Sequence, residues 1–165
     1  MKTSKMTLLG LFTAVAMILS FVESQLPPLT TALPGIRMGL PNIAIMFILY
    51  RFGWKEASVV SIVRVILVSL LFGSVMSMAY SLAGAILSLL IMTLMQKFTP
   101  FNRVSISIVG GVCHNIGQII VAWLVTDTAQ IVYYLPVLLI SGSAAGILVG
   151  LAAGILEKRV PKIKY

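Results

Sequence analysis

Residues 131–156 have the sequence IVYYLPVLLISGSAAGILVGLAAGIL, a continuous run without a charged side chain. Four basic residues follow it closely, Lys158, Arg159, Lys162 and Lys164. A helix needs about 20 apolar residues, at about 1.5 Å each, to cross the hydrocarbon core of a bilayer. Cytoplasmic segments carry an excess of Lys and Arg. The stretch therefore predicts a membrane-spanning helix whose carboxyl end lies in the cytoplasm.

The rest of the chain repeats this arrangement of apolar runs and basic ends. The other clusters are Lys2 with Lys5, Arg51 with Lys55, and Lys97 with Arg103. The length criterion predicts six spans, at residues 6–22, 40–50, 54–72, 75–95, 104–125 and 131–156. Alternating spans place all four clusters on one side, so we expect both termini in the cytoplasm. The second span is short and needs either an extension from residue 36 or a thinned bilayer.

Composition supports a membrane protein. Hydrophobic residues make up 59% of the chain and charged residues 10%, whereas soluble domains have about 25% charged residues. The net charge of +8 is spread over the basic ends, where we expect membrane lipids and intracellular partners but no nucleic acid. The single Cys113 excludes a disulfide framework and a thiolate cluster. We predict one all-α domain over residues 1–165, a bundle of six transmembrane helices with no metal or cofactor.

Small residues recur along three of the predicted spans. The last span has Gly142, Gly146, Gly150 and Gly154 at a spacing of four, which forms one stripe of a helix. Such stripes let two helix backbones approach closely. We interpret this one as packing within the bundle, and the alternative is docking of a second membrane subunit. The fourth span has a similar stripe, Ser74, Ser77, Ser81, Gly84 and Ser88. For the pair Gly10 and Ala14 in the first span, packing and external docking both stay open.

Polar residues at membrane depth are the candidate site. Arg64 lies nine residues beyond Lys55, about 13 Å along a helix and near the bilayer middle. Burying an arginine there costs about 2.5–3.5 kcal/mol, and such residues usually face a cavity or a partner. An anionic group of a solute would suit Arg64. A polar pocket open to the outside would be lined by Glu23, Arg37, Asn42, Arg64, Tyr80, His114, Asn115 and Gln118. Alternatively, Arg64 and His114 only stabilise the bundle.

Four segments carry a family resemblance. They are PGIRMGLPNI at 34–43, Arg64 with LFG at 71–73, YSLAG at 80–84 and HNIGQ at 114–118. In this order they resemble the Gx transporter family, which is also labelled heptaprenyl diphosphate synthase component I. That family is similar to the substrate-binding S components of energy-coupling factor transporters, which have six helices and an outward pocket.

The resemblance implies a multi-pass protein of a bacterial cell membrane that binds a small anionic or lipophilic solute, such as a vitamin, a cofactor or a prenyl or quinone precursor. The implied partners are an energy-coupling transmembrane subunit and ATPase subunits. The solute would contact Arg37, Asn42, Arg64, Tyr80, His114, Asn115 and Gln118 under a loop formed by residues 23–38. Gly10 and Ala14 would contact the coupling subunit, and Gly10 stands where the family usually has an alanine.

The synthase label requires chemistry for which this sequence lacks the residues. Elongation of prenyl diphosphates needs aspartate-rich clusters that hold magnesium on the diphosphate. The four acidic residues here, Glu23, Glu56, Asp127 and Glu157, are far apart in sequence, and no Walker lysine motif is present. We therefore expect no catalytic residues and no enzyme activity. Two other hypotheses stay open: a membrane subunit of a prenyl diphosphate or quinone biosynthesis complex, and an assembly protein for a membrane electron-transfer system.

Overall fold

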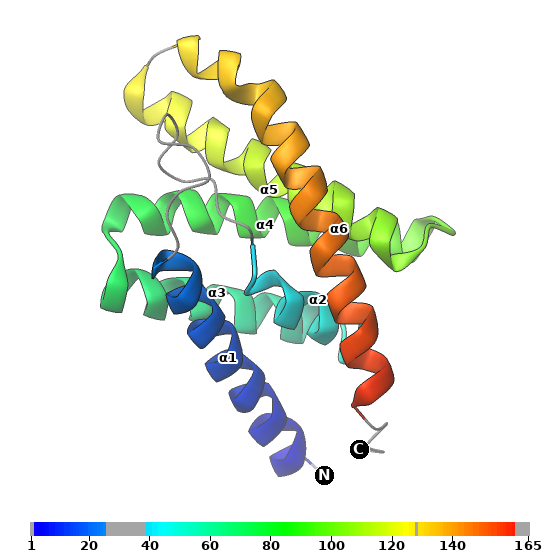
Figure 1. Cartoon of the computed structure of the whole chain (residues 1–165). Helices are drawn as coiled ribbons and strands as arrows, with labels where there is room; N and C mark the ends of the chain where they lie inside the picture. The colour runs from blue at the N-terminus through cyan, green and yellow to red at the C-terminus, as the bar shows by residue number, and fades with distance from the viewer. Residues whose placement is uncertain (1, 26–38, 128, 161–165) are drawn as a thin grey trace.

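The protein is all-helical in a computed structural model that describes residues 2–25, 39–127 and 129–160. Six α-helices and one short 3-10 helix follow one another (Figure 1), namely α1 Lys2–Gln25, α2 Asn42–Arg51, α3 Trp54–Phe72, α4 Val75–Phe98, α5 Arg103–Thr126, η1 Ala129–Tyr134 and α6 Leu135–Arg159. No strand occurs among these described residues. The predicted all-α class is confirmed.

Four of the described helices are long and apolar enough to cross a membrane: α1 from Lys5, α4, α5 as far as Val125, and α6. Helix α3 has 19 residues but contains Lys55, Glu56 and Arg64. Helix α2 has ten residues, so it is about 15 Å long against a hydrocarbon core of about 30 Å. Large apolar side chains such as Leu70 and Leu148 point outward, as in a protein surrounded by lipid. The chain is a helical membrane protein, and six crossings remain a prediction.

Helix α2 lies inside the bundle. It packs against α1, α3 and α6, and its residues 44–49 are all buried. A helix that is apolar on every side must be enclosed by other elements. This explains why a helix too short to span the bilayer is part of a membrane protein: its neighbours cover it, and it fills the interior between them.

The basic ends of the helices gather at one end of the bundle. Lys5 of α1 forms an ion pair with Glu56 at the start of α3, and Arg103 of α5 pairs with Glu157 near the end of α6. The Arg103 guanidinium also lies 4.5 Å from the ring centroid of Tyr50 on α2. Figure 1 shows the first turn of α1 and the last turn of α6 on the same side. We call this side the basic end, and its cytoplasmic location remains a prediction.

Glycines bring α5 into backbone contact with α6. A Cβ atom at Gly146 would lie 2.6 Å from the Ile108 Cα atom and from the Ser107 carbonyl oxygen, and one at Gly142 would lie 2.8 Å from the Gly111 carbonyl oxygen. Real Cβ atoms do not approach other atoms so closely. Three members of the α6 glycine stripe, Gly142, Gly146 and Gly150, are buried, so they are used for packing within the bundle.

Candidate functional site

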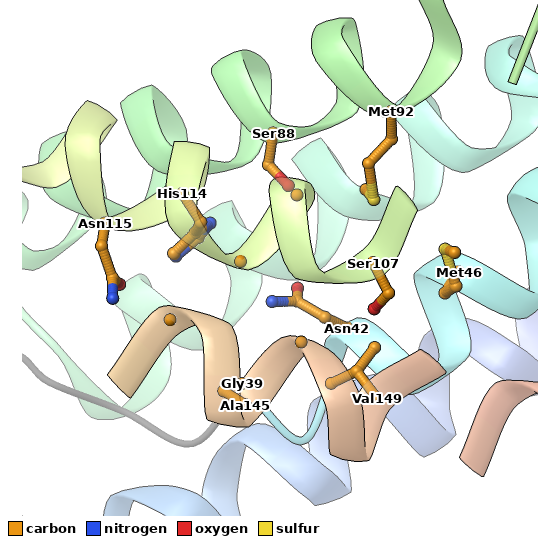
Figure 2. Close-up of a pocket in the computed structure, with 14 residues that line it drawn as sticks. Gly39, Asn42, Met46, Ser88, Met92, Ser107, His114, Asn115, Ala145 and Val149 are labelled. Atoms are coloured by element: carbon orange, nitrogen blue, oxygen red, sulfur yellow. The ribbon is translucent and has the colours of Figure 1, made fainter. Parts of the chain in front are cut away.

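A small cavity lies where α2, α4, α5 and α6 meet. Its volume is about 30 Å³, which holds one or two water molecules. Figure 2 shows the Asn42 amide extending from α2 into the space between α5 and α6, with Ser88 and Ser107 nearby. Met46, Met92 and Val149 form apolar parts of the wall, and His114 and Asn115 lie at the other side. No described residue of this wall carries a full charge at neutral pH unless His114 is protonated.

Three polar side chains of the cavity have free hydrogen-bonding capacity. Hydroxyls inside helices usually donate to the carbonyl four residues earlier, as Ser20 does to Ala16 and Ser143 to Leu139, both at 2.8 Å. Within the described part of the chain, the side chains of Asn42, Ser88 and Ser107 form no hydrogen bond. Ser88 and Ser107 are buried and Asn42 is partly exposed. Polar groups without a protein partner at a cavity normally bind water or a ligand.

Asn115 differs because its amide is already used by the protein. Its Nδ2 donates to the Leu138 carbonyl oxygen at 2.7 Å and lies 3.4 Å from the Ser141 Oγ atom. Both acceptors belong to α6, and Asn115 itself is on α5. The side chain therefore joins the two helices beside the cavity, where membrane proteins commonly use a polar interhelical bond.

Replacing Asn115 by leucine should destabilise the protein by about 1 kcal/mol, the scale of an interhelical hydrogen bond in a membrane. For a chain of this size the apparent melting temperature in detergent should fall by about 2–4 °C. Gln118→Leu is the matched control, because Gln118 lies one turn further along α5 and forms no side-chain hydrogen bond with the described residues. Equal losses in both variants would contradict a structural role specific to Asn115.

His114 packs directly on α4. A Cβ atom at Gly84 would be 2.9 Å from the His114 Nδ1 atom and 2.8 Å from its carbonyl oxygen. A second close contact between these helices is at Gly117, where a Cβ atom would be 2.7 Å from the Ala83 carbonyl oxygen. Arg64 of α3 is close enough to His114 for an electrostatic interaction. The sequence motifs around Gly84 and His114 thus form one contact between α4 and α5.

The predicted site residues have different positions in the structure. Asn42, His114 and Asn115 line the cavity. Arg64 is buried on α3, but neither it nor Tyr80 nor Gln118 is among the described residues of the wall. Arg37 and most of the predicted covering loop, residues 26–38, lie outside the described residues. Glu23 is buried and accepts a hydrogen bond from the Gly39 amide, and Gly39 also lines the cavity.

The cavity extends closer to the basic end than the predicted pocket. Ser107 is one turn from Arg103 in α5, and sequence reasoning did not single it out. A signal was present, because Ser107, Gly111 and His114 follow one another at steps of four and three and so share a helix face. Ser88 belongs to the α4 stripe, which is interpreted from the sequence as packing or as docking of a second membrane subunit but not as part of the pocket.

Gly10 and Ala14, the predicted coupling contact, are both exposed on α1. A Cβ atom added at Gly10 would have no neighbour within 4 Å. Among the described residues, neither takes part in the cavity wall. The two surfaces that the resemblance implies therefore lie apart, one inside the bundle and one on its lipid-facing side.

Comparison with protein families identifies the chain. A family model described as heptaprenyl diphosphate synthase component I matches residues 12–156. The chain belongs to the heptaprenyl diphosphate synthase component I family. Comparisons with curated proteins and with solved structures give no match. The match confirms the resemblance found from the four sequence segments, which all lie inside the matched range.

The acidic residues of this family member have separate places in the fold. Glu23 contacts Gly39, Glu56 pairs with Lys5, and Glu157 pairs with Arg103. Asp127 is the C-cap of α5 in a left-handed conformation. Among the described residues, no three His, Cys, Asp or Glu side chains gather where they could hold a metal ion.

Proposed function

We propose that the chain is a substrate-binding membrane subunit of an energy-coupling factor type uptake transporter. The observation that carries the proposal is the small cavity in which Asn42, Ser88 and Ser107 have no hydrogen-bond partner among the described residues. Proteins seldom leave several polar groups unpaired at one place unless water or a ligand binds there. The resemblance of the family to S components supports the same function, in which the chain binds a solute. We expect no enzyme activity.

Solute binding requires the cavity to widen. Small-molecule sites usually have a volume of about 300–1,000 Å³, and this cavity has about 30 Å³. The contacts of α5 with α6 and with α4 are between backbones at glycines and leave little room for rearrangement. Helix α2 contributes Asn42 and Met46 to the wall, and Asn42, its first residue, is partly exposed whereas residues 44–49 are buried. We therefore propose that the amino end of α2 is the part of the wall that moves when solute enters.

Mass spectrometry of small molecules extracted from the purified protein tests this function. The wild type and the control variant Gln96→Ala, at an exposed position of α4, should carry the same compound. Asn42→Ala should lose most of it because the amide points into the cavity. Arg64→Ala should lose it as well if the Arg64 guanidinium supplies positive charge next to His114.

The other outcomes separate the competing hypotheses. If folded wild-type protein carries nothing beyond bulk lipid and Arg64→Ala simply unfolds, the transporter proposal is wrong and an assembly protein for a membrane electron-transfer system becomes the better hypothesis. The family description favours a second candidate, a membrane subunit of a prenyl diphosphate or quinone biosynthesis complex. Copurification with a soluble synthase, in the absence of ATPase subunits, would support that candidate.

A further inference from the structure

A groove lies between α1 and α3 on the outside of the bundle, close to the basic end. Its volume is about 300 Å³. Its lining comes from α1 and α3 and consists of Leu9, Gly10, Thr13, Lys55, Glu56, Val59, Val60 and Val63. Most of these side chains are partly or fully exposed, so the groove is open to the surrounding lipid.

Two contacts join α1 and α3, and the groove lies between these contacts at Gly10, which has no side chain. Lys5 and Glu56 connect α1 and α3 at the basic end. Further along, Phe21 of α1 packs against Phe72 of α3 with ring centroids 4.9 Å apart and the rings tilted by 52°. Between these contacts Gly10 has no side chain, and a Cβ atom placed there would find nothing within 4 Å. The space is therefore a fixed feature of the helix pair.

The lining combines apolar walls with Lys55 and with Glu56, whose carboxylate is paired with Lys5. Val59, Val63 and Leu9 are apolar, and the Thr13 hydroxyl is turned to its own helix, where it donates to the Leu9 carbonyl at 2.8 Å. Lys55 lies at the end of the groove in the first turn of α3 and its Nζ atom is 5.8 Å from the ring centroid of the exposed Trp54. Tryptophan and lysine in this arrangement are typical of the headgroup level of a membrane.

The charge at this end of the groove is positive. Glu56, the nearest carboxylate, is already ion-paired with Lys5, so Lys55 adds a cation that this pair does not neutralise. A phosphate group at Lys55 would also lie near the amino end of α3, which has no side-chain cap and favours negative charge. An apolar groove that ends in a cation at headgroup depth has the chemistry of a site for an anionic lipid.

We propose that this groove binds one anionic phospholipid, with an acyl chain along Val59 and Val63 and the phosphate at Lys55. An acyl chain with a phosphate headgroup matches an apolar groove of about 300 Å³ that has a lysine at the basic end. The site is distinct from the cavity but shares Gly10 with the proposed coupling contact, and lipid retention can be measured independently of transport.

Lipid retention measured by mass spectrometry tests the proposal. The purified protein is mixed with equal amounts of phosphatidylglycerol and phosphatidylcholine in detergent micelles, and the lipids that remain bound are counted. The wild type should retain phosphatidylglycerol preferentially. Lys55→Gln should reduce this preference about fivefold, the effect of one basic residue near a membrane surface. Gly10→Leu should remove the bound lipid, because leucine fills the groove at a position with free space.

Lys97→Gln is the matched control. Lys97 belongs to the basic cluster at the end of α4 and lies over an aromatic ring, with its Nζ atom 5.2 Å from the Phe98 centroid, but it does not line the groove. A loss of preference in Lys97→Gln equal to that in Lys55→Gln would overturn the proposal, since attraction would then be a general property of the basic end. The proposal would also be overturned if Gly10→Leu retained as much phosphatidylglycerol as the wild type. A protein segment bound in the groove of the wild type in place of lipid would overturn it as well.

Discussion

Replacing Gly146 by alanine should lower the apparent melting temperature of the purified protein by about 2–10 °C, and replacing it by leucine should prevent folding. The new Cβ atom would lie 2.6 Å from two backbone atoms of α5, the Ile108 Cα and the Ser107 carbonyl oxygen. Backbone atoms of a packed helix cannot move away as a flexible side chain can. Overpacking of this kind costs about 1–3 kcal/mol and sometimes more, and here it would separate α5 from α6 beside the cavity.

Two other glycines provide the controls for this experiment. A Cβ atom at Gly10 would meet nothing within 4 Å, and one at Gly154 would meet only the Arg103 Nη1 atom at 3.6 Å, an ordinary contact. Gly10→Ala and Gly154→Ala should therefore leave the melting temperature unchanged or raise it, because alanine favours a helix by up to about 1 kcal/mol over glycine. Similar losses in all three variants would show that close contact at Gly146 is not the cause.

Much of the fold can be predicted from the apolar runs, since each run is bounded by charges, glycines or prolines. Residues 54–72 coincide with α3 because Gly53 and Gly73 flank the run, and Gly53 has a φ of +108° that favours glycine. The start of α6 is harder to predict. The apolar run begins at 131, but residues 129–134 form a 3-10 helix, and α6 starts at Leu135 with Pro136 in its first turn, where proline fits well.

The beginning of α1 illustrates a different limit. The length criterion places the first span at residues 6–22, whereas the helix runs from Lys2 to Gln25. Hydrophobicity indicates which residues are suited to the hydrocarbon core, but helical hydrogen bonding continues through polar residues on both sides of it. Helix and membrane span are therefore different quantities. Only the former is observed in the structure.

The candidate site could be predicted in part, because some residue types are unusual at membrane depth. Asn42 and His114 are conspicuous in apolar runs, and both line the cavity. Serine is common in membrane helices, so the importance of Ser88 and Ser107 depends on which helices face one another. The sequence predicts that Arg64 on α3 lines the site. In the structure α2 lines the cavity instead, and α2 packs against both α3 and α6. The position of such a short helix cannot be inferred from length and hydrophobicity.

Replacing Ala14 by leucine should abolish solute uptake by cells but leave solute binding by the purified protein unchanged. Ala14 is exposed on α1, one turn from Gly10, and small residues at this spacing permit close approach of a partner helix. A leucine side chain would hold an energy-coupling subunit away from α1. Binding should persist because no described residue of α1 lines the cavity. The measurement is uptake of the compound found by mass spectrometry, compared with the amount that the purified variant retains.

Ala144→Leu is the control for this variant, because Ala144 is also an exposed alanine in a long apolar helix, on α6. Uptake should continue in Ala144→Leu, because an exposed leucine on a membrane helix contacts lipid and does not disturb the bundle. Normal uptake in Ala14→Leu would show that the coupling surface is elsewhere. Loss of the bound compound in Ala14→Leu would contradict the separation of the two surfaces, because a substitution on the outside of α1 would then have reached the cavity between α2, α4, α5 and α6.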